Sequence, residues 1–279
     1  MLSLEASLVE TDCGQLGVIG EYNELDESAL VIGGWKQNQA RRLNVQNCLY
    51  EYGISSISVS PFEDSINLET ITDLPEVSDL KTIQASILKR SLWLIRDAAR
   101  DVREVFGGMP NRVLTHSGGA NVYLLGLHNS YSDPVLPNRG VLAEPMIAEG
   151  LTLRDYTRPA KTHQTKFESG DSSRINFRAL APEGATLDQS KSIENLTSIL
   201  NSKGATLFAE AIKNGAQLAI ILGQEDFAAP ESTLVSSLAS HQLDPAKYIH
   251  HYDNNDVKLG HGYLLDSPAN ALKDIVPLL

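Results

Sequence analysis

The feature that most constrains the fold is a repeated alternation of short apolar segments with segments of helical spacing. Eight segments have the length and the Val, Ile and Leu content of strands, at residues 4–11, 15–22, 29–34, 54–62, 112–117, 140–147, 217–226 and 247–253. Helical patterns separate most of them, at residues 37–53, 80–106, 119–130, 231–242 and 267–279. Strands that alternate with helices of this length predict a mostly parallel sheet with helices on both faces.

The ends of this pattern give further detail. Residues 4–11 and 15–22 are separated by only three residues, which predicts an antiparallel hairpin at the start of the sheet. Residues 29–34 and 217–226 are nearly continuous apolar runs, as expected of strands buried on both faces. The predicted fold class is therefore α/β, with an eight-stranded and mostly parallel sheet.

The alternation breaks between residues 148 and 201, which are polar and contain no clear strand. About 50 residues are too many for a simple crossover. Leu196, Ile199 and Leu200 give the end of this segment an apolar side, which favours a small helical cap over a surface excursion without structure. The predicted organisation is a core domain of residues 1–147 and 202–279, with residues 148–201 as a cap or lid insertion.

Composition narrows the classes of partner and compartment. The net charge of −12 argues against a nucleic-acid partner and against adsorption to anionic membranes, because both need clustered Lys and Arg. No basic segment followed by a long apolar run begins the chain, and no stretch approaches the roughly 18 apolar residues of a membrane span. Cys13 and Cys48 form no metal-ligand spacing and no disulfide framework, so two reduced thiols and a cytoplasmic protein are expected.

The segment Thr115-His116-Ser117-Gly118-Gly119 joins a predicted strand directly to a predicted helix. A serine flanked at two residues' distance by small residues is typical of a nucleophile elbow, in which a strained turn exposes the hydroxyl. Thr115 stands where such elbows usually have glycine. The alternative is a structural turn that only needs its glycines.

A serine nucleophile needs a base, and the base needs an acid that orients it. Asp226 ends the predicted strand 217–226, and His261 follows the last predicted strand. The order Ser117, Asp226, His261 is the Ser–acid–His order of α/β-hydrolases. Glu225 and Glu144, the latter at another strand end, are alternative acids. By strand alternation His116 points away from the site. His250 and His251 lie within a predicted strand, and His128, His163 and His241 lack supporting context.

These motifs together resemble the α/β-hydrolase superfamily, in particular serine esterases and lipases with a cap. The resemblance covers nearly the whole chain and rests on "IGGW", "THSGG", "GQED…P" and "GHGYLLDSP", each on the expected element. It implies Ser117 as nucleophile, His261 as base and Asp226 as the orienting acid. It also implies an oxyanion hole made by the backbone N–H groups of Gly118 and Trp35. Many relatives read His-Gly-x where this chain reads Gly33-Gly34-Trp35, which removes a histidine from that loop.

The expected activity is hydrolysis of a small or medium carboxylic ester through an acyl-enzyme intermediate, without cofactor or metal. The histidines form no metal-ligand spacing, and no nucleotide-binding glycine motif is present. The expected partner is thus a small-molecule substrate rather than nucleic acid or membrane. Alternatives on the same fold are amide, thioester or C–C bond cleavage, acyl transfer and cyanohydrin lysis; a further alternative is a ligand-binding protein without catalysis.

Overall fold

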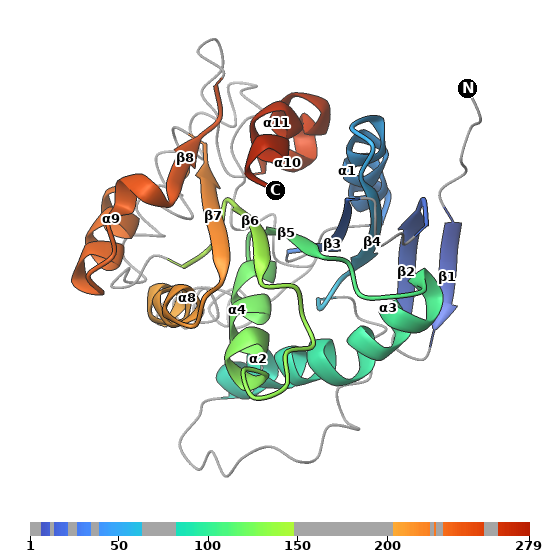
Figure 1. Cartoon of the computed structure of the whole chain (residues 1–279), viewed down its shortest axis with the longest axis horizontal. Coiled ribbons are helices and arrows are strands. Elements are labelled where there is room, and N and C mark those ends of the chain that lie inside the picture. Colours follow the sequence, from blue (N-terminus) through green and yellow to red (C-terminus); the bar gives the residue numbers. More distant parts are fainter. Residues whose placement is uncertain are drawn as a thin grey trace, which may run out of the picture.

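The sheet has eight strands, as the sequence predicts. A computed structural model describes residues 7–11, 14–21, 27–34, 39–62, 82–147, 203–223, 226, 231–253 and 262–279. Its strands are β1 (Ser7–Thr11), β2 (Gly14–Ile19), β3 (Ser28–Ile32), β4 (Ser55–Val59), β5 (Arg112–His116), β6 (Arg139–Ala143), β7 (Gln217–Leu222) and β8 (Ile249–His251). They lie in the order β1-β2-β4-β3-β5-β6-β7-β8 (Figure 1).

The predicted hairpin is confirmed, and the sheet is parallel from β4 to β8. Strand β2 pairs antiparallel with both β1 and β4, whereas β3, β5, β6 and β7 pair parallel with all their neighbours. The hairpin turn contains Gly14 at a φ of 107°, a conformation that glycine adopts without strain. The Thr11 hydroxyl donates a hydrogen bond of 2.8 Å to the Gly14 carbonyl and closes the turn.

Helices follow the strands in the predicted alternation. Their bounds are α1 (Gln39–Glu51), α2 (Thr82–Trp93), α3 (Ala99–Phe106), α4 (Gly119–Asn129), α8 (Gly204–Lys213), α9 (Glu231–Ser240), α10 (Tyr263–Asp266) and α11 (Pro268–Ile275). The single helix predicted at residues 80–106 is instead α2 and α3 joined by a π-helical turn, Leu94–Ala98. Helix α8 was not among the predicted elements.

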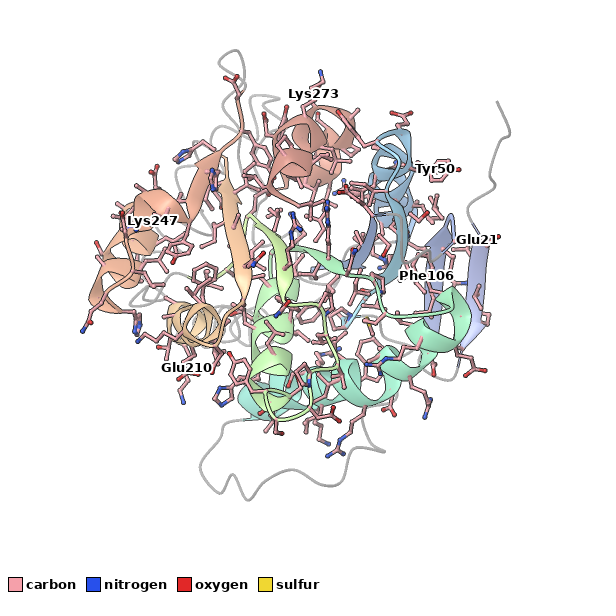
Figure 2. All side chains as sticks on the ribbon, viewed as in Figure 1. Glu21, Tyr50, Phe106, Glu210, Lys247 and Lys273 are labelled. Carbon is pink, nitrogen blue, oxygen red and sulfur yellow. The ribbon has the colours of Figure 1, made fainter. Side chains whose placement is uncertain are left out.

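Both faces of the sheet are covered, as predicted. Along β3, Leu30 and Ile32 pack into one core, whereas Ala29 and Val31 pack into the other, because side chains of a strand alternate between the faces. The first core includes residues of α2, α3, α4 and α8, and the second includes residues of α1, α10 and α11 (Figure 1). Polar side chains such as Glu210, Lys247 and Lys273 lie at the periphery (Figure 2).

The structure shortens several predicted strands at their carboxyl ends. Strand β6 ends at Ala143 rather than at residue 147, and β7 ends at Leu222 rather than at residue 226. These ends matter because they place Glu144 and Asp226 after the strands rather than within them. The predicted cap, residues 148–201, lies outside the described residues. Within the described part of the chain, no helix combines the length and apolar character needed to cross a membrane.

Candidate active site

Ser117 occupies the turn between β5 and α4. Its φ is 52°, in the left-handed region that non-glycine residues rarely adopt. The turn is fixed on both sides, because the Ser117 N–H donates to the carbonyl of Ala143 at 3.1 Å and the Ala120 N–H donates to the carbonyl of Ser117 at 3.1 Å. A strained, buried serine held between a strand and a helix is the backbone geometry of a nucleophile elbow.

The glycines around the elbow are explained by close backbone contacts. A Cβ atom added to Gly119 would lie 2.7 Å from the carbonyl oxygen of Gly33 and 2.8 Å from that of Ile32. A Cβ atom on Gly34 would lie 2.8 Å from the His116 carbonyl oxygen and 2.9 Å from the Ser117 Cβ. The loop that follows β3 is therefore packed directly against the elbow, and no side chain fits between them.

Backbone N–H groups gather at the start of α4. Gly118 is the N-cap residue of this helix, where N–H groups lack partners within the helix and the helix dipole favours negative charge. This is where an oxyanion beside Ser117 would be stabilised. Trp35, the other predicted donor, lies outside the described residues.

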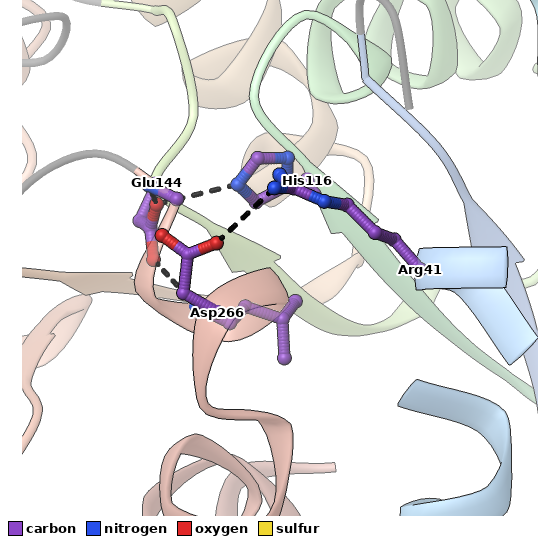
Figure 3. A network of polar contacts seen from close by, with 6 residues as sticks. Arg41, His116, Glu144 and Asp266 are labelled. Carbon is purple, nitrogen blue, oxygen red and sulfur yellow. Dashed lines mark hydrogen bonds and ion pairs between the residues drawn. The ribbon is translucent and has the colours of Figure 1, made fainter. Parts of the chain in front are cut away.

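Glu144 follows β6 directly and adopts almost the same backbone conformation as Ser117, with a φ of 50°. Its side chain has no solvent exposure. Its Oε2 accepts a hydrogen bond from the Gly262 N–H and lies 3.2 Å from the His116 Nε2, and its Oε1 accepts from the Leu264 N–H at 3.1 Å (Figure 3). The carboxylate thus joins the elbow to the chain that enters α10.

Tyr252 lies beside this carboxylate, and Tyr263 packs against Tyr252. Tyr252 is buried just after β8, and its ring contacts the ring of Tyr263 edge-on, with centroids 4.9 Å apart. Burial, and next the charge of Glu144, raise the pKa of the Tyr252 phenol well above its usual range. The phenol is therefore neutral at any physiological pH.

An exposed ion pair lies beside the network. Arg41 of α1 and Asp266 of α10 approach to 3.6 Å and link the two helices (Figure 3). Both side chains are more than half exposed, so this contact contributes little to stability.

Of the predicted acid and base, only the acid, Asp226, lies within the described residues. Asp226 is buried after β7, where its N–H donates to the Gly223 carbonyl at 3.2 Å. His261 lies outside the described residues, as does Glu225. Gly262, the next residue along the chain, is described, and its contact with Glu144 lies at the end of β6, the strand beside β5.

Three other histidines lie on surface elements. His128 pairs with Glu210 at 2.9 Å and His251 pairs with Glu231 at 3.2 Å, all partly exposed. His241 lies 3.4 Å from the Thr206 hydroxyl. Among the described side chains, no group of three His, Cys, Asp or Glu residues could hold a metal ion.

Two partnerships at the site were not predicted. The sequence indicates His116 only as a residue that faces away from the nucleophile, and Glu144 only as an alternative acid. Their contact with each other depends on the pairing of β5 with β6, and the contact with Gly262 spans 118 residues. No local pattern in the sequence signals either contact.

Solved structures resemble the whole chain. A thioesterase domain from the curacin biosynthetic pathway matches with a TM-score of 0.55 and 13% identity, over 98% of this chain and 99% of its own. A hydrolase from Oleispira antarctica matches with a TM-score of 0.52 and 10% identity, over 94% and 93% of the two chains. A structure from a study of carboxylesterases of the ammonia-oxidizing thaumarchaeon Nitrososphaera gargenis matches with a TM-score of 0.50 and 12% identity, over 97% and 96%.

The chain has the α/β-hydrolase fold. The strand order, the elbow after β5 and the length of these matches all agree with the resemblance seen in the sequence. No protein-family model and no curated protein matches the sequence. The similarity to known proteins therefore lies in the architecture of this α/β-hydrolase fold.

Proposed function

We propose that the protein is a serine hydrolase that cleaves a small or medium carboxylic ester through an acyl-enzyme intermediate. The observation that carries this proposal is the strained Ser117 at the end of β5, next to the N-terminus of α4. Strain of about 1–3 kcal/mol persists only where the surrounding structure enforces it, and it is concentrated at functional sites.

In the proposed reaction, the Ser117 Oγ attacks the ester carbonyl carbon while His261 takes the hydroxyl proton. The C–O bond to the alcohol then breaks, and His261 returns the proton to the departing oxygen. A water molecule next attacks the acyl group, gives its proton to His261 and releases the carboxylic acid, after which Ser117 regains its proton. The N–H groups of Gly118 and Trp35 would stabilise the negative oxygen of each tetrahedral intermediate.

Two features support Asp226 rather than Glu144 as the acid that orients His261. Both oxygens of Glu144 already accept hydrogen bonds from the backbone. Asp226 is buried at the end of a neighbouring strand, where the Ser–acid–His order of this fold expects an acid.

The test is a comparison of the parent protein with Ser117→Ala. We expect the parent to hydrolyse p-nitrophenyl acetate or butyrate and to be labelled at Ser117 by a fluorophosphonate, and we expect the variant to do neither. Thioester, amide and cyanohydrin substrates in the same assay separate the ester hydrolase from other reactions of an elbow serine. A folded parent protein that neither turns over any substrate nor reacts with the probe would indicate a ligand-binding protein instead.

A further inference from the structure

The buried carboxylate of Glu144 needs a function of its own, because burying a charge is unfavourable unless hydrogen bonds compensate it. Its two oxygens accept from the N–H groups of Gly262 and Leu264, and the His116 ring and the Tyr252 phenol lie beside them. A carboxylate can only accept hydrogen bonds, so the His116 Nε2 carries a hydrogen when it bonds to Glu144. With no solvent exposure, Glu144 is not available to a substrate.

The His116 ring also contacts the loop that follows β3. A Cβ atom on Gly34 would lie 3.2 Å from the His116 Nδ1, whereas the other ring nitrogen, Nε2, faces Glu144. Since residues 33 and 34 are both glycine, this loop has no side chain of its own there to fix its position. The His116 ring supplies a wall against which it packs.

The Gly262 contact links the same pair to the predicted base. Gly262 is the residue after His261 in the sequence, so the pair holds the chain at the first described position beyond the predicted base. The Leu264 N–H adds a second fixed point within the same turn of chain. Gly262, Leu264 and Glu144 are all buried, and hydrogen bonds held away from water are stronger.

We propose that the buried His116–Glu144 pair is a positioning unit that aligns the elbow, the loop after β3 and the start of α10 at Gly262 and Leu264. Neither residue touches the substrate. The inference rests on the proposed function, since Ser117 is the proposed nucleophile and the two aligned segments adjoin His261 and Trp35 in the sequence. A displacement of about 1 Å at such groups is enough to cost about 10²-fold in rate.

The primary test is Glu144→Gln. Glutamine has nearly the same shape, but its NH₂ group would face one of the two backbone N–H donors, so one anchor of the chain after His261 is lost. We expect kcat to fall about 10²-fold with little change in KM, and fluorophosphonate labelling of Ser117 to slow in parallel.

Gln46→Glu provides the matched control. Gln46 is equally buried, and its amide donates to the carbonyls of Gly17 and Ser56 at 3.0 and 3.1 Å, near the start of β4. This variant also exchanges an amide and a carboxylate inside the fold, but beside β2 and β4 rather than beside β6. We expect it to lower the melting temperature while kcat of the folded protein stays at the parent value.

A second variant covers the case in which Glu144→Gln does not fold. His116→Phe keeps a ring against Gly34 but removes the bond to Glu144, and we expect a smaller loss of kcat. If both single variants fold, their double variant should lose less than the product of the two single losses, because both break one contact.

The outcomes separate the two proposals. If the parent is labelled at Ser117 but both variants keep its kcat and labelling rate, the positioning role is wrong and the hydrolase proposal stands. If the variants lose kcat only as far as Gln46→Glu does, the pair is merely structural. If the folded parent is not labelled and hydrolyses nothing, both proposals fail together.

Discussion

The carboxyl ends of β5 and β6 share one backbone conformation and differ in what surrounds it. Ser117 and Glu144 follow adjacent strands with φ values of 52° and 50°. Ser117 is next to the first N–H groups of α4, where a reacting oxygen could be stabilised. Glu144 is enclosed, and protein groups surround both its oxygens.

The comparison shows that backbone strain alone does not identify a reactive side chain. In the same conformation, the Ser117 side chain is a proposed nucleophile, whereas the Glu144 side chain is a buried hydrogen-bond acceptor. What separates them is their partners: the first N–H groups of α4 in one case, and hydrogen bonds from Gly262 and Leu264 in the other. Four predictions test this distinction, in order of decreasing effect.

The largest effect is expected for Ser117→Ala. Removal of the proposed nucleophile should lower kcat/KM by about 10⁴-fold or more, while the melting temperature changes little because the hydroxyl is small. Ester hydrolysis and thermal unfolding, measured on the same preparation, check this. Activity at the parent level would show that the strained turn has no chemical role.

Gly34→Ala is expected to have the next largest effect. The added Cβ would meet the His116 carbonyl and the Ser117 Cβ at less than 3.0 Å, so the loop after β3 must move away from the elbow. Loss of one oxyanion donor typically costs about 10²–10³-fold in kcat, which is the range expected here. As a control, Gly53→Ala adds a Cβ with no atom within 4 Å; its φ of 78° strains alanine and lowers stability, but kcat of the folded protein should stay unchanged.

A pair of glycine substitutions tests the comparison itself through stability. Ser117→Gly should raise the free energy of unfolding by about 1 kcal/mol, because glycine adopts a positive φ without strain. Glu144→Gly relieves the same strain but removes the buried hydrogen bonds, so a net loss of about 2–3 kcal/mol is expected. Urea unfolding of both variants gives the signs; two shifts in the same direction would contradict the comparison.

The smallest effect is expected for the stability of the protein at alkaline pH, through Tyr252 beside Glu144. The pKa of Tyr252 is raised by burial and by the Glu144 charge, so the folded state holds this proton more tightly than the unfolded state. The contribution of the protonated Tyr252 phenol to the free energy of unfolding is complete below the ordinary tyrosine pKa of about 10. It is lost as the pH rises above that value.

Tyr252→Phe should therefore weaken the alkaline decline in stability by about 1 kcal/mol per pH unit near pH 10–11. Urea midpoints from pH 8 to 11 measure it. Tyr123→Phe is a useful parallel, because burial also raises the pKa of Tyr123, whose hydroxyl bonds to the Pro137 carbonyl far from Glu144. Identical pH curves for the parent and Tyr252→Phe would show that Tyr252 is not enclosed as described.

The sequence was sufficient for the fold class because the signals for it are local and repeated. Apolar runs such as that of β7 and helical spacing such as that of α4 each require only neighbouring residues to be interpreted. The elbow was also predictable, since Ser117 and its glycines are contiguous. The ends of the elements were less predictable. Strands β6 and β7 stop before polar residues that the sequence analysis had placed inside the strands.

The partnerships of the site depend on contacts that no local pattern encodes. His116 was expected only to face away from the nucleophile. Strand alternation does not indicate that its ring would bond to Glu144, which follows the next strand of the sheet. Likewise, Glu144 was considered as an acid because of its place at a strand end. Its actual partners come from a turn of chain more than a hundred residues later.

The π turn at Leu94–Ala98 has a consequence for any redesign of the long helix. A π turn accommodates one residue more than a regular helix does, and each residue of an α-helix advances the side-chain direction by about 100°. Deleting a single residue there would restore regular hydrogen bonding but swing Leu88 and Leu92 off the core they now fill. The shorter and more regular helix would thus expose these apolar side chains to solvent.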